Sequence, residues 1–444
     1  MLEADKTDIL FVLLVKELKN MKKKFQIITI FLLVLGVIFT LTSCKPVSNI
    51  TIQAENLLDG VTSQKVAGKA ADQIFIDAQL DLALKLFKAS VNESVEEKEN
   101  VLISPLSILL ALSMTANGAD GQTKTEMEAL LGGGITIEDL NEYLYAYVNS
   151  LPSSDQYKLK IANSIWYREM NGLYVKPTFL QTTVNYYNAE LYKSPFNDTT
   201  LKDINKWVNK NTDGMIEKIL DSISPDAMLY LINALVFNSK WEEKYTSNQI
   251  SDDEFTNILN IRQAVEMMNS RELKYLSCPT AQGFIKPYKD NKYSFAALLP
   301  NMDVDIYDFI NSLTTESLSN ILNNVEDAMV YAAIPKFSYD YSITMNKMLT
   351  DMGMPTAFNP LSANFKNMAE LVGNNLHIGT VLHKTFIEVD EEGTKAAAVT
   401  GIGSETSIDP LCHYVKLDRP FVYMILDNET NLPIFIGALT QIQE

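Results

Sequence analysis

The sequence predicts one large domain of the mixed α+β class, preceded by an export segment. Helical periodicity dominates the first part of the domain, and strand-like runs of aromatic and aliphatic residues follow it. The two kinds of element interleave without a regular βαβ alternation, which favours α+β over a doubly wound sheet. With 444 residues and 47% hydrophobic content, the chain can bury a large core.

Composition excludes several classes of function. The formal net charge is -18, and Lys and Arg do not cluster beyond the N-terminus, so we expect no nucleic-acid partner. The three histidines occur without an HExxH or CxxC motif, so no metal site is predicted. There is no GxSxG elbow and no P-loop. We therefore expect neither an enzyme nor a bound cofactor.

The N-terminus has the order of a secretory signal. Met21 and three lysines precede residues 27–41, which carry no charge, and Leu41-Thr42-Ser43-Cys44 follows. The apolar part is shorter than the roughly 20 residues of a membrane span. The last four residues resemble a bacterial lipobox, which predicts lipidation of Cys44 and an exported, lipid-anchored protein at the cell surface or in the periplasm. Residues 1–20 precede a plausible start at Met21 and need not be translated.

Residues 45–71 are polar and aperiodic, and we interpret them as a flexible tether. Neither a linker nor an internal repeat follows, so residues 72–444 form one domain of about 370 residues. If Cys44 is lipidated, Cys278 and Cys412 remain, and the sequence leaves their pairing open.

Helices are expected early in the domain. Ile74, Ala78, Leu82 and Leu86 fall near one helical face, and residues 107–116 form an apolar run after the capping pair Ser104-Pro105. Strands are expected later, where aromatic and aliphatic residues gather. The predicted strands are Leu229–Phe237, Tyr293–Leu299, Met329–Ile334, Thr385–Val389 and Phe421–Leu426.

Six short blocks occur in order between residues 72 and 442. They are Asn100–Ile108 (NVLISPLSI), Ala116–Met127 (ANGADGQTKTEM), Ile204–Asn209 with Thr212 and Ile216, Asn233-Ala234 with Trp241, Ile334-Pro335-Lys336-Phe337, and Asp418-Arg419-Pro420-Phe421 with Phe435-Ile436-Gly437. Together they resemble the serpin family, whose members are mostly protease inhibitors. The resemblance implies the serpin fold, with mixed sheets, about nine helices and an exposed reactive-centre loop.

The stretch after the strand Thr385–Val389 matches the hinge of that loop. The hinge residues are Glu391, Glu392, Gly393, Thr394, Ala396, Ala397 and Ala398. In serpins the cleaved loop inserts into the main sheet, and this sheet insertion releases stored strain. A segment that is loop first and central strand later needs small side chains, because the sheet is packed at interior density. Strand alternation predicts that Thr394, Ala396 and Ala398 face inward and that Lys395 faces outward.

A second group of residues matches the family's polar cluster beneath the central strands, here called the shutter. The resemblance assigns Ser104, Ser107, Asn233 and His383 to the shutter, where hydrogen bonds must break as the sheet opens. A buried imidazole needs hydrogen-bond partners whether or not the sheet moves. Trp241 matches a tryptophan near the insertion entry, and a core aromatic role is compatible with that.

The resemblance implies a suicide inhibitor that traps a protease as its acyl-enzyme. Family loop length places the reactive bond between Ser407 and Ile408, although Thr406 or Ile408 could precede the bond instead. A small residue there predicts an elastase-like or subtilisin-like target. The alternatives are a papain-like cysteine protease as target, or a non-inhibitory serpin that acts as a binding module. The expected partners are the protease and, through the lipid, a membrane; we expect a monomer.

Overall fold

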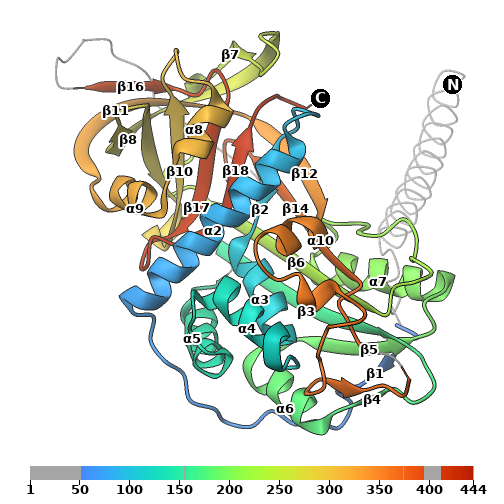
Figure 1. Ribbon diagram of the computed structural model, residues 1–444. Helices are drawn as coiled ribbons and strands as arrows, with labels where there is room; N and C mark the ends of the chain where they lie inside the picture. The colour runs from blue at the N-terminus through green and yellow to red at the C-terminus, as the bar shows by residue number, and fades with distance from the viewer. Residues whose placement is uncertain (1–51, 155–156, 374, 395–411, 444) are drawn as a thin grey trace, which may run out of the picture. The chain divides into compact units, whose positions relative to one another are not determined.

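The computed structural model describes residues 52–154, 157–373, 375–394 and 412–443 (Figure 1). Residues 52–444 form one compact unit, which includes residues that we predicted as tether. Glu55–Asn56 (β1) pairs with Glu190–Ser194 (β5). The buried carboxylate of Asp203 accepts hydrogen bonds from the backbone N–H groups of Gln53 and Ala54. The predicted tether is therefore wrong for its described part, because the segment has partners on the domain.

The described residues contain nine α-helices, in agreement with the predicted number. They are α2 (Gln73–Ser94), α3 (Pro105–Ala116), α4 (Gly121–Gly132), α5 (Ile137–Ser150), α6 (Pro177–Tyr186), α7 (Asp198–Asn211), α8 (Ile306–Ser312), α9 (Thr315–Asn323) and α10 (Asn346–Asp351). Helix α3 begins as predicted, since the Ser104 side chain accepts from the N–H of Ser107. In the part of the chain described here, no helix has the length and apolar character that crossing a membrane requires.

The predicted apolar face of α2 is wrong at its N-terminus. Leu82 and Leu86 are buried, but Ile74 is 69% exposed and Phe75 takes the core position. Each residue of an α-helix advances about 100° around the axis, so residues spaced by four are offset by about 40°. A row of residues at that spacing therefore winds slowly around the helix. Ile74 and Leu86 are three such spacings apart and lie on different faces of the helix, which explains why Leu86 is buried and Ile74 is exposed.

The first large sheet has the order β1-β5-β3-β6-β14-β12, and β15 also pairs with β6. Its further strands are β3 (Tyr157–Arg168), β6 (Leu229–Lys240), β12 (Phe337–Thr344), β14 (Thr380–Val389) and β15 (Gly393–Thr394). Strand β14 lies between a parallel partner, β6, and an antiparallel partner, β12. The sheet is therefore mixed, as predicted.

The second large sheet has the order β16-β11-β8-β9-β10-β17-β18-β2, with β7 paired to β8. Its strands are β2 (Val101–Ile103), β7 (Ile250–Thr256), β8 (Arg262–Cys278), β9 (Ala281–Pro287), β10 (Tyr293–Pro300), β11 (Glu326–Pro335), β16 (His413–Lys416), β17 (Phe421–Asp427) and β18 (Pro433–Leu439). A two-stranded sheet joins β4 (Tyr174–Val175) to β13 (Ala369–Glu370). All five predicted strands lie within observed ones.

Two hydrophobic clusters fix the position of the first sheet. Helix α3 contacts β3 and β6 of this sheet and β18 of the second sheet, within the main core. Trp207 of α7 belongs to a separate cluster with Ile232 of β6 and Leu382 of β14. Helix α7 therefore packs against the first sheet, in a cluster to which both β6 and β14 contribute.

Candidate functional site

Strands β6 and β14 pair along only part of their length. Thr380 to Lys384 of β14 pair with Tyr230 to Ala234 of β6. After Lys384, strand β14 continues to Val389 and pairs with β12. Beyond Ala234, the described residues provide partners on the β14 side of β6 only for Ser239 and Lys240, which pair with β15. The edge of β6 between residues 234 and 239 therefore has no strand partner on that side among the described residues, and we call this edge with the facing part of β14 the slot.

The predicted hinge begins in a tight turn at the mouth of this slot. The Asp390 carboxylate accepts from the N–H groups of Glu392 (2.8 Å) and Gly393 (3.1 Å), and the Asp390 N–H donates to Gly393 O. Gly393 has φ +154°, and a Cβ there would lie 2.1 Å from the Ser239 carbonyl oxygen. Only glycine allows this approach between the turn and β6.

Thr394 already lies in the sheet as an antiparallel partner of Ser239. It is buried, and its hydroxyl is 2.8 Å from the Tyr288 hydroxyl. The inward orientation expected for Thr394 therefore agrees with its position. Trp241 stacks on Tyr288 with ring centroids 4.5 Å apart. The indole N–H of Trp241 donates to Asp390 O and its backbone N–H donates to Glu392 O, so Trp241 anchors the turn.

Two ion pairs hold the acidic hinge residues. Lys244 Nζ lies 2.6 Å from the carboxylate of Glu392, which is buried. Lys336 Nζ lies 2.8 Å from Glu391 and 3.0 Å from Glu266. The hydrogen bond from Lys336 lowers the pKa of Glu391 below its ordinary value. Burial raises the pKa of Asp390, although the two N–H groups that it accepts oppose that shift.

The four predicted shutter residues lie together beneath the strands. His383 Nε2 accepts from the Ser104 N–H (3.1 Å), so the ring proton lies on Nδ1, which donates to Asn233 Oδ1 (3.1 Å). Asn233 Nδ2 in turn donates to Ser107 O (2.6 Å) and to Asn163 Oδ1 (2.5 Å). The chain of bonds thus links α3 to β3, β6 and β14, where the slot ends.

Burial lowers the pKa of His383 to about 3. Protonation would place a charge in the core and would also remove the acceptor that Nε2 offers to the Ser104 N–H. His383 is therefore neutral in the folded protein near neutral pH.

Several predicted positions lie outside the described residues, namely Cys44, Ala396, Ala397, Ala398, Ser407 and Ile408. Sequence reasoning missed three residues that complete the site: Asp390, Tyr288 and Asn163. The role of Asp390 could have been predicted, because an Asp two or three residues before a Gly is typical of turns in which the Asp side chain accepts backbone hydrogen bonds. Tyr288 follows β9 and Asn163 lies on β3, so both are distant in sequence from the hinge and from His383 and carry no local signal.

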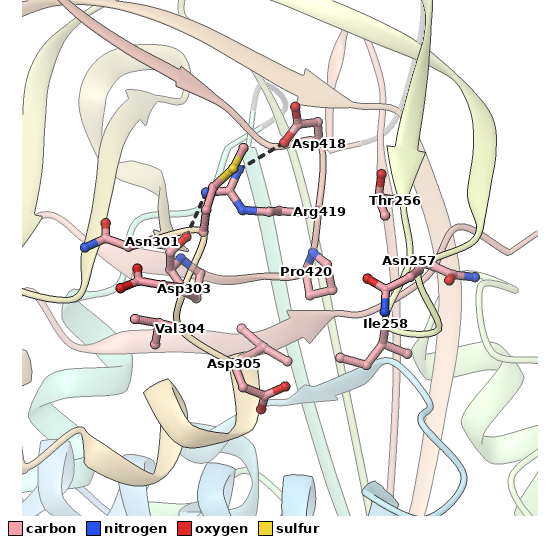
Figure 2. A pocket seen from close by; sticks show the side chains of 14 residues that line it. Thr256, Asn257, Ile258, Asn301, Asp303, Val304, Asp305, Asp418, Arg419 and Pro420 are labelled. Carbon is pink, nitrogen blue, oxygen red and sulfur yellow. Dashed lines mark hydrogen bonds and ion pairs between the residues drawn. The ribbon is translucent and has the colours of Figure 1, made fainter.

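Asp418, Arg419 and Pro420, from the last of the six sequence blocks, line a separate pocket of about 480 Å³ (Figure 2). Arg419 donates to Pro300 O (2.8 Å) and to the Asp418 carboxylate (3.1 Å), which ties the start of β17 to the end of β10. The hinge and shutter residues do not line this pocket. The two described cysteines, Cys278 and Cys412, are both free.

We predict that His383 makes stability depend on pH. Its folded pKa of about 3 lies below the unfolded value of about 6.5, so its contribution is full above pH 6.5 and falls as pH drops toward 3. The difference in unfolding free energy between wild type and His383→Gln should shrink by about 2 to 3 kcal/mol from pH 7.5 to 4.5. Urea unfolding at both pH values measures it. A difference that stays constant would contradict a buried, neutral imidazole.

Comparisons with known proteins agree with this geometry. The family model described as "Serpin (serine protease inhibitor)" matches residues 77–442. A serpin-like protein of Methanosarcina acetivorans is 30% identical, over 80% of this chain and 85% of its own length. Intracellular coagulation inhibitor 2 of Tachypleus tridentatus is 30% identical, over 78% of this chain and 87% of its own length.

A solved structure gives the same result for the fold. The thermophilic serpin tengpin in its native state is 45% identical, with a TM-score of 0.84, and the match covers 88% of this chain and all of tengpin. The hinge turn, the slot and the polar cluster described above therefore lie in a fold shared with a solved serpin. This chain belongs to the serpin family.

Proposed function

We propose that this protein is a suicide inhibitor of serine proteases that inserts its cleaved loop between β6 and β14. The slot beside β6 carries the proposal, because β15 already occupies its mouth and points into it. Family membership supports protease inhibition in general.

The register of β15 defines the path of insertion. Gly393 pairs with Lys240 and Thr394 with Ser239, so an extended strand would set Lys395 opposite Asn238 and Ala398 opposite Leu235. On β6, Ser239 and Phe237 are buried while Lys240 and Asn238 are partly exposed. Thr394 and Ala396 would then face the core, and Lys395 would face outward.

Insertion divides into two stages on this path. Residues 395–398 would fill the existing slot without displacing β14. Val399 would then meet Ala234, which is paired with Lys384. From that residue on, the β6–β14 pairs and the adjacent shutter bond between Asn233 and His383 must break. The shutter therefore opposes complete insertion until cleavage frees the loop.

The trapped species would be the acyl-enzyme. The protease serine attacks the reactive bond, the new chain end leaves, and insertion carries the attached protease away before water attacks the ester. Deacylation fails once the serine is displaced from its base and oxyanion donors. Roughly ten or more new backbone hydrogen bonds, each worth about 1 kcal/mol net, supply the driving force. The rate of insertion relative to hydrolysis decides the outcome.

The sequence of the loop separates two alternative functions from the proposed one. A non-inhibitory binding module has no need for small residues between Thr394 and Thr400, where this sequence has only small residues apart from Lys395 and Val399. A papain-like cysteine protease reads mainly the residue before the cut one, so Thr406 rather than Ser407 would matter. The small Ser407 favours an elastase-like or subtilisin-like target.

We also propose that the protein is exported and lipid-anchored through Cys44. The proposal rests on the basic start, the uncharged residues 27–41 and the lipobox-like Leu41-Thr42-Ser43-Cys44.

The inhibitory mechanism predicts a covalent complex. Wild type mixed with subtilisin or pancreatic elastase should form a complex that survives a denaturing gel. Thr394→Arg should be cleaved without forming it, because Thr394 is buried beside Tyr288 and a guanidinium there would be unpaired. Lys395→Glu is the matched control and should trap as wild type does. Cleavage of wild type without any complex would exclude the mechanism, and trapping by Thr394→Arg would exclude the insertion path.

The position of the reactive bond is a separate prediction. Mass spectrometry of the C-terminal fragment, which denaturation separates from the complex, should show Ile408 as the new N-terminus. A bond after Thr406 would still fit a target protease that accepts small side chains, whereas a bond after Ile408 would indicate one that accepts a branched aliphatic side chain. Cleavage between Lys395 and Gly401 would overturn the assignment, because the inserted strand would then be too short to carry the protease across the sheet.

Lipidation predicts that Cys44→Ala releases or misprocesses the protein in a bacterial host. Metabolic labelling with an alkyne fatty acid should mark wild type and leave the variant unlabelled, and fractionation should move the variant out of the membrane fraction. Cys278→Ala, at a free cysteine within the domain, is the control. Absence of label from wild type, with membrane association equal in both, would contradict the proposal.

A further inference from the structure

Three large hydrophobic side chains are exposed around the two-stranded sheet of β4 and β13. Tyr174 of β4 is 58% exposed, Val372 is 79% exposed and Leu361 is 88% exposed. Val372 lies beside the residues that precede β4, since a Cβ on Gly172 would be only 3.0 Å from its side chain. The side-chain amide of Asn375 donates to Leu361 O (3.2 Å), which places Leu361 near the same segment. We call Tyr174, Leu361 and Val372 the apolar face.

The apolar face lies close to the point where the N-terminal segment joins the domain. Gln53 and Ala54 bind Asp203 through their backbone N–H groups. Glu169 lines the same cavity of about 300 Å³ as these three residues. It precedes Tyr174 by 5 residues, which span at most about 18 Å. Figure 1 shows β4 on the side of the domain that carries β1 and β5, with β16 at the opposite end.

A lipid on Cys44 limits which side of the domain can approach a membrane. Cys44 precedes Ile52, the first described residue, by 8 residues, which span at most about 29 Å. A domain the size of residues 52–444 has a radius of gyration of about 21 Å and is thus more than about 50 Å across. Turning the β16 end toward the bilayer would lift Ile52 by roughly that width, which exceeds the span of the tether. The tether therefore keeps the apolar face on the side nearest the bilayer.

Charge does not draw this side of the domain to a membrane. The formal net charge of the chain is -18. Lys176 is paired with Glu370 (3.2 Å) and Lys193 with Glu55 (2.6 Å), so neither lysine is free to attract anionic headgroups. A contact must then come from the apolar and aromatic side chains. Tyrosine suits the membrane–water boundary, because its ring has an apolar body and a polar tip.

We propose that the apolar face contacts the headgroup and acyl-chain boundary of the bilayer that holds Cys44. The contact orients the domain so that β16, where the reactive loop rejoins it, is directed away from the membrane. This inference rests on the proposed function, because it takes the lipid on Cys44 from there. Three side chains bind a bilayer too weakly to hold a free protein, but a short tether keeps them at a high effective concentration beside it.

Loop insertion would carry the protease toward this same side. In the register of β15, each step along the loop moves one residue back along β6 (394 pairs with 239, so 407 with 226), which would set Ser407 opposite Asp226. Arg168, at the end of β3, donates to Ala227 O (2.6 Å), so that point adjoins the residues that lead to β4. An inserted strand with its many backbone hydrogen bonds outweighs a contact of three side chains. Trapping should therefore lift the apolar face off the bilayer, within the reach of the tether.

Tryptophan fluorescence tests the contact, because the native Trp166, Trp207 and Trp241 are all buried. Tyr174→Trp adds an indole on the apolar face, and Tyr414→Trp adds one on β16 at nearly the same exposure (58% and 53%). The lipidated protein, purified from the membrane fraction of a bacterial host, is added to phosphatidylcholine vesicles with or without brominated acyl chains. Brominated lipid quenches an indole that reaches the bilayer, and wild type gives the contribution of the native tryptophans.

The added indole of Tyr174→Trp should lose most of its emission in brominated vesicles, whereas Tyr414→Trp and wild type should not change. Adding Val372→Asp to Tyr174→Trp should remove this quenching, because a carboxylate at the bilayer boundary opposes the contact. Met302→Asp, at an 87% exposed position between β10 and α8, is the matched control and should leave the quenching intact. Circular dichroism and thermal unfolding check that every variant is folded.

The covalent complex with subtilisin gives a second readout on the same vesicles. Once the complex has formed, Tyr174→Trp should emit equally in brominated and plain vesicles. Quenching that persists in the complex would contradict the lifting of the apolar face.

Unquenched emission from vesicle-bound, lipid-labelled Tyr174→Trp would overturn the membrane contact. Crosslinked dimers that Val372→Asp abolishes, without quenching, would assign the apolar face to a second copy and also overturn it. Failure of the lipid anchor looks different, because the protein then carries no lipid label and does not bind the vesicles, and the orientation falls with the anchor. Failure of inhibition leaves the protein without a covalent complex but with the quenching of Tyr174→Trp intact.

Discussion

The incomplete pairing of β6 with β14 is the constraint on which the rest of the site depends. The two strands share five residue pairs, and the β6 edge between Ala234 and Ser239 has no strand partner on that side among the described residues. Backbone N–H and C=O groups on such an edge gain most when another strand arrives. The hinge turn, Gly393 and the buried Thr394 place the start of β15 at the mouth of the slot, as the proposed insertion requires. Among the described residues, this part of the β6 edge is left without a strand partner.

The hinge and the shutter control different parts of this slot. At the mouth, the Asp390 turn, Trp241 and the Lys244–Glu392 pair position the first strand residues in the only register that continues into the slot. At the far end, the neutral His383 joins β14 to the N-terminus of α3 and to Asn233 of β6. The His383 and Asn233 side chains are both hydrogen-bonded in this network, although the buried Ser107 hydroxyl has no partner, and breaking the network exposes several groups at once. Under the proposed mechanism, this difference would let the protein be ready for insertion and still remain uninserted before cleavage.

The sequence predicted local features well and distant contacts poorly. Ser104-Pro105 predicted the start of α3 because a cap is a local interaction. The predicted start of β14 at Thr385 is late, since the strand begins at Thr380. Val381, Leu382 and His383 are all buried because β14 is covered on both faces, and such a run lacks the alternation that marks a strand. The docking of Gln53 on Asp203 and the contact between Tyr288 and Thr394 join residues more than 100 positions apart, which no local pattern encodes.

The most direct measurement of the central claim is hydrogen exchange at β6 before and after the loop is cut. The backbone amides of residues 235–238 are read in the intact protein and in the protein cleaved near Ser407. If the loop fills the slot, the amides of residues 235–238 and 385–388 that point toward the slot become strongly protected on cleavage, and the alternate amides, which face β3 and β12, stay as they were. Unchanged exchange along β6 and β14 after complete cleavage would contradict the account, because the slot would then have remained empty.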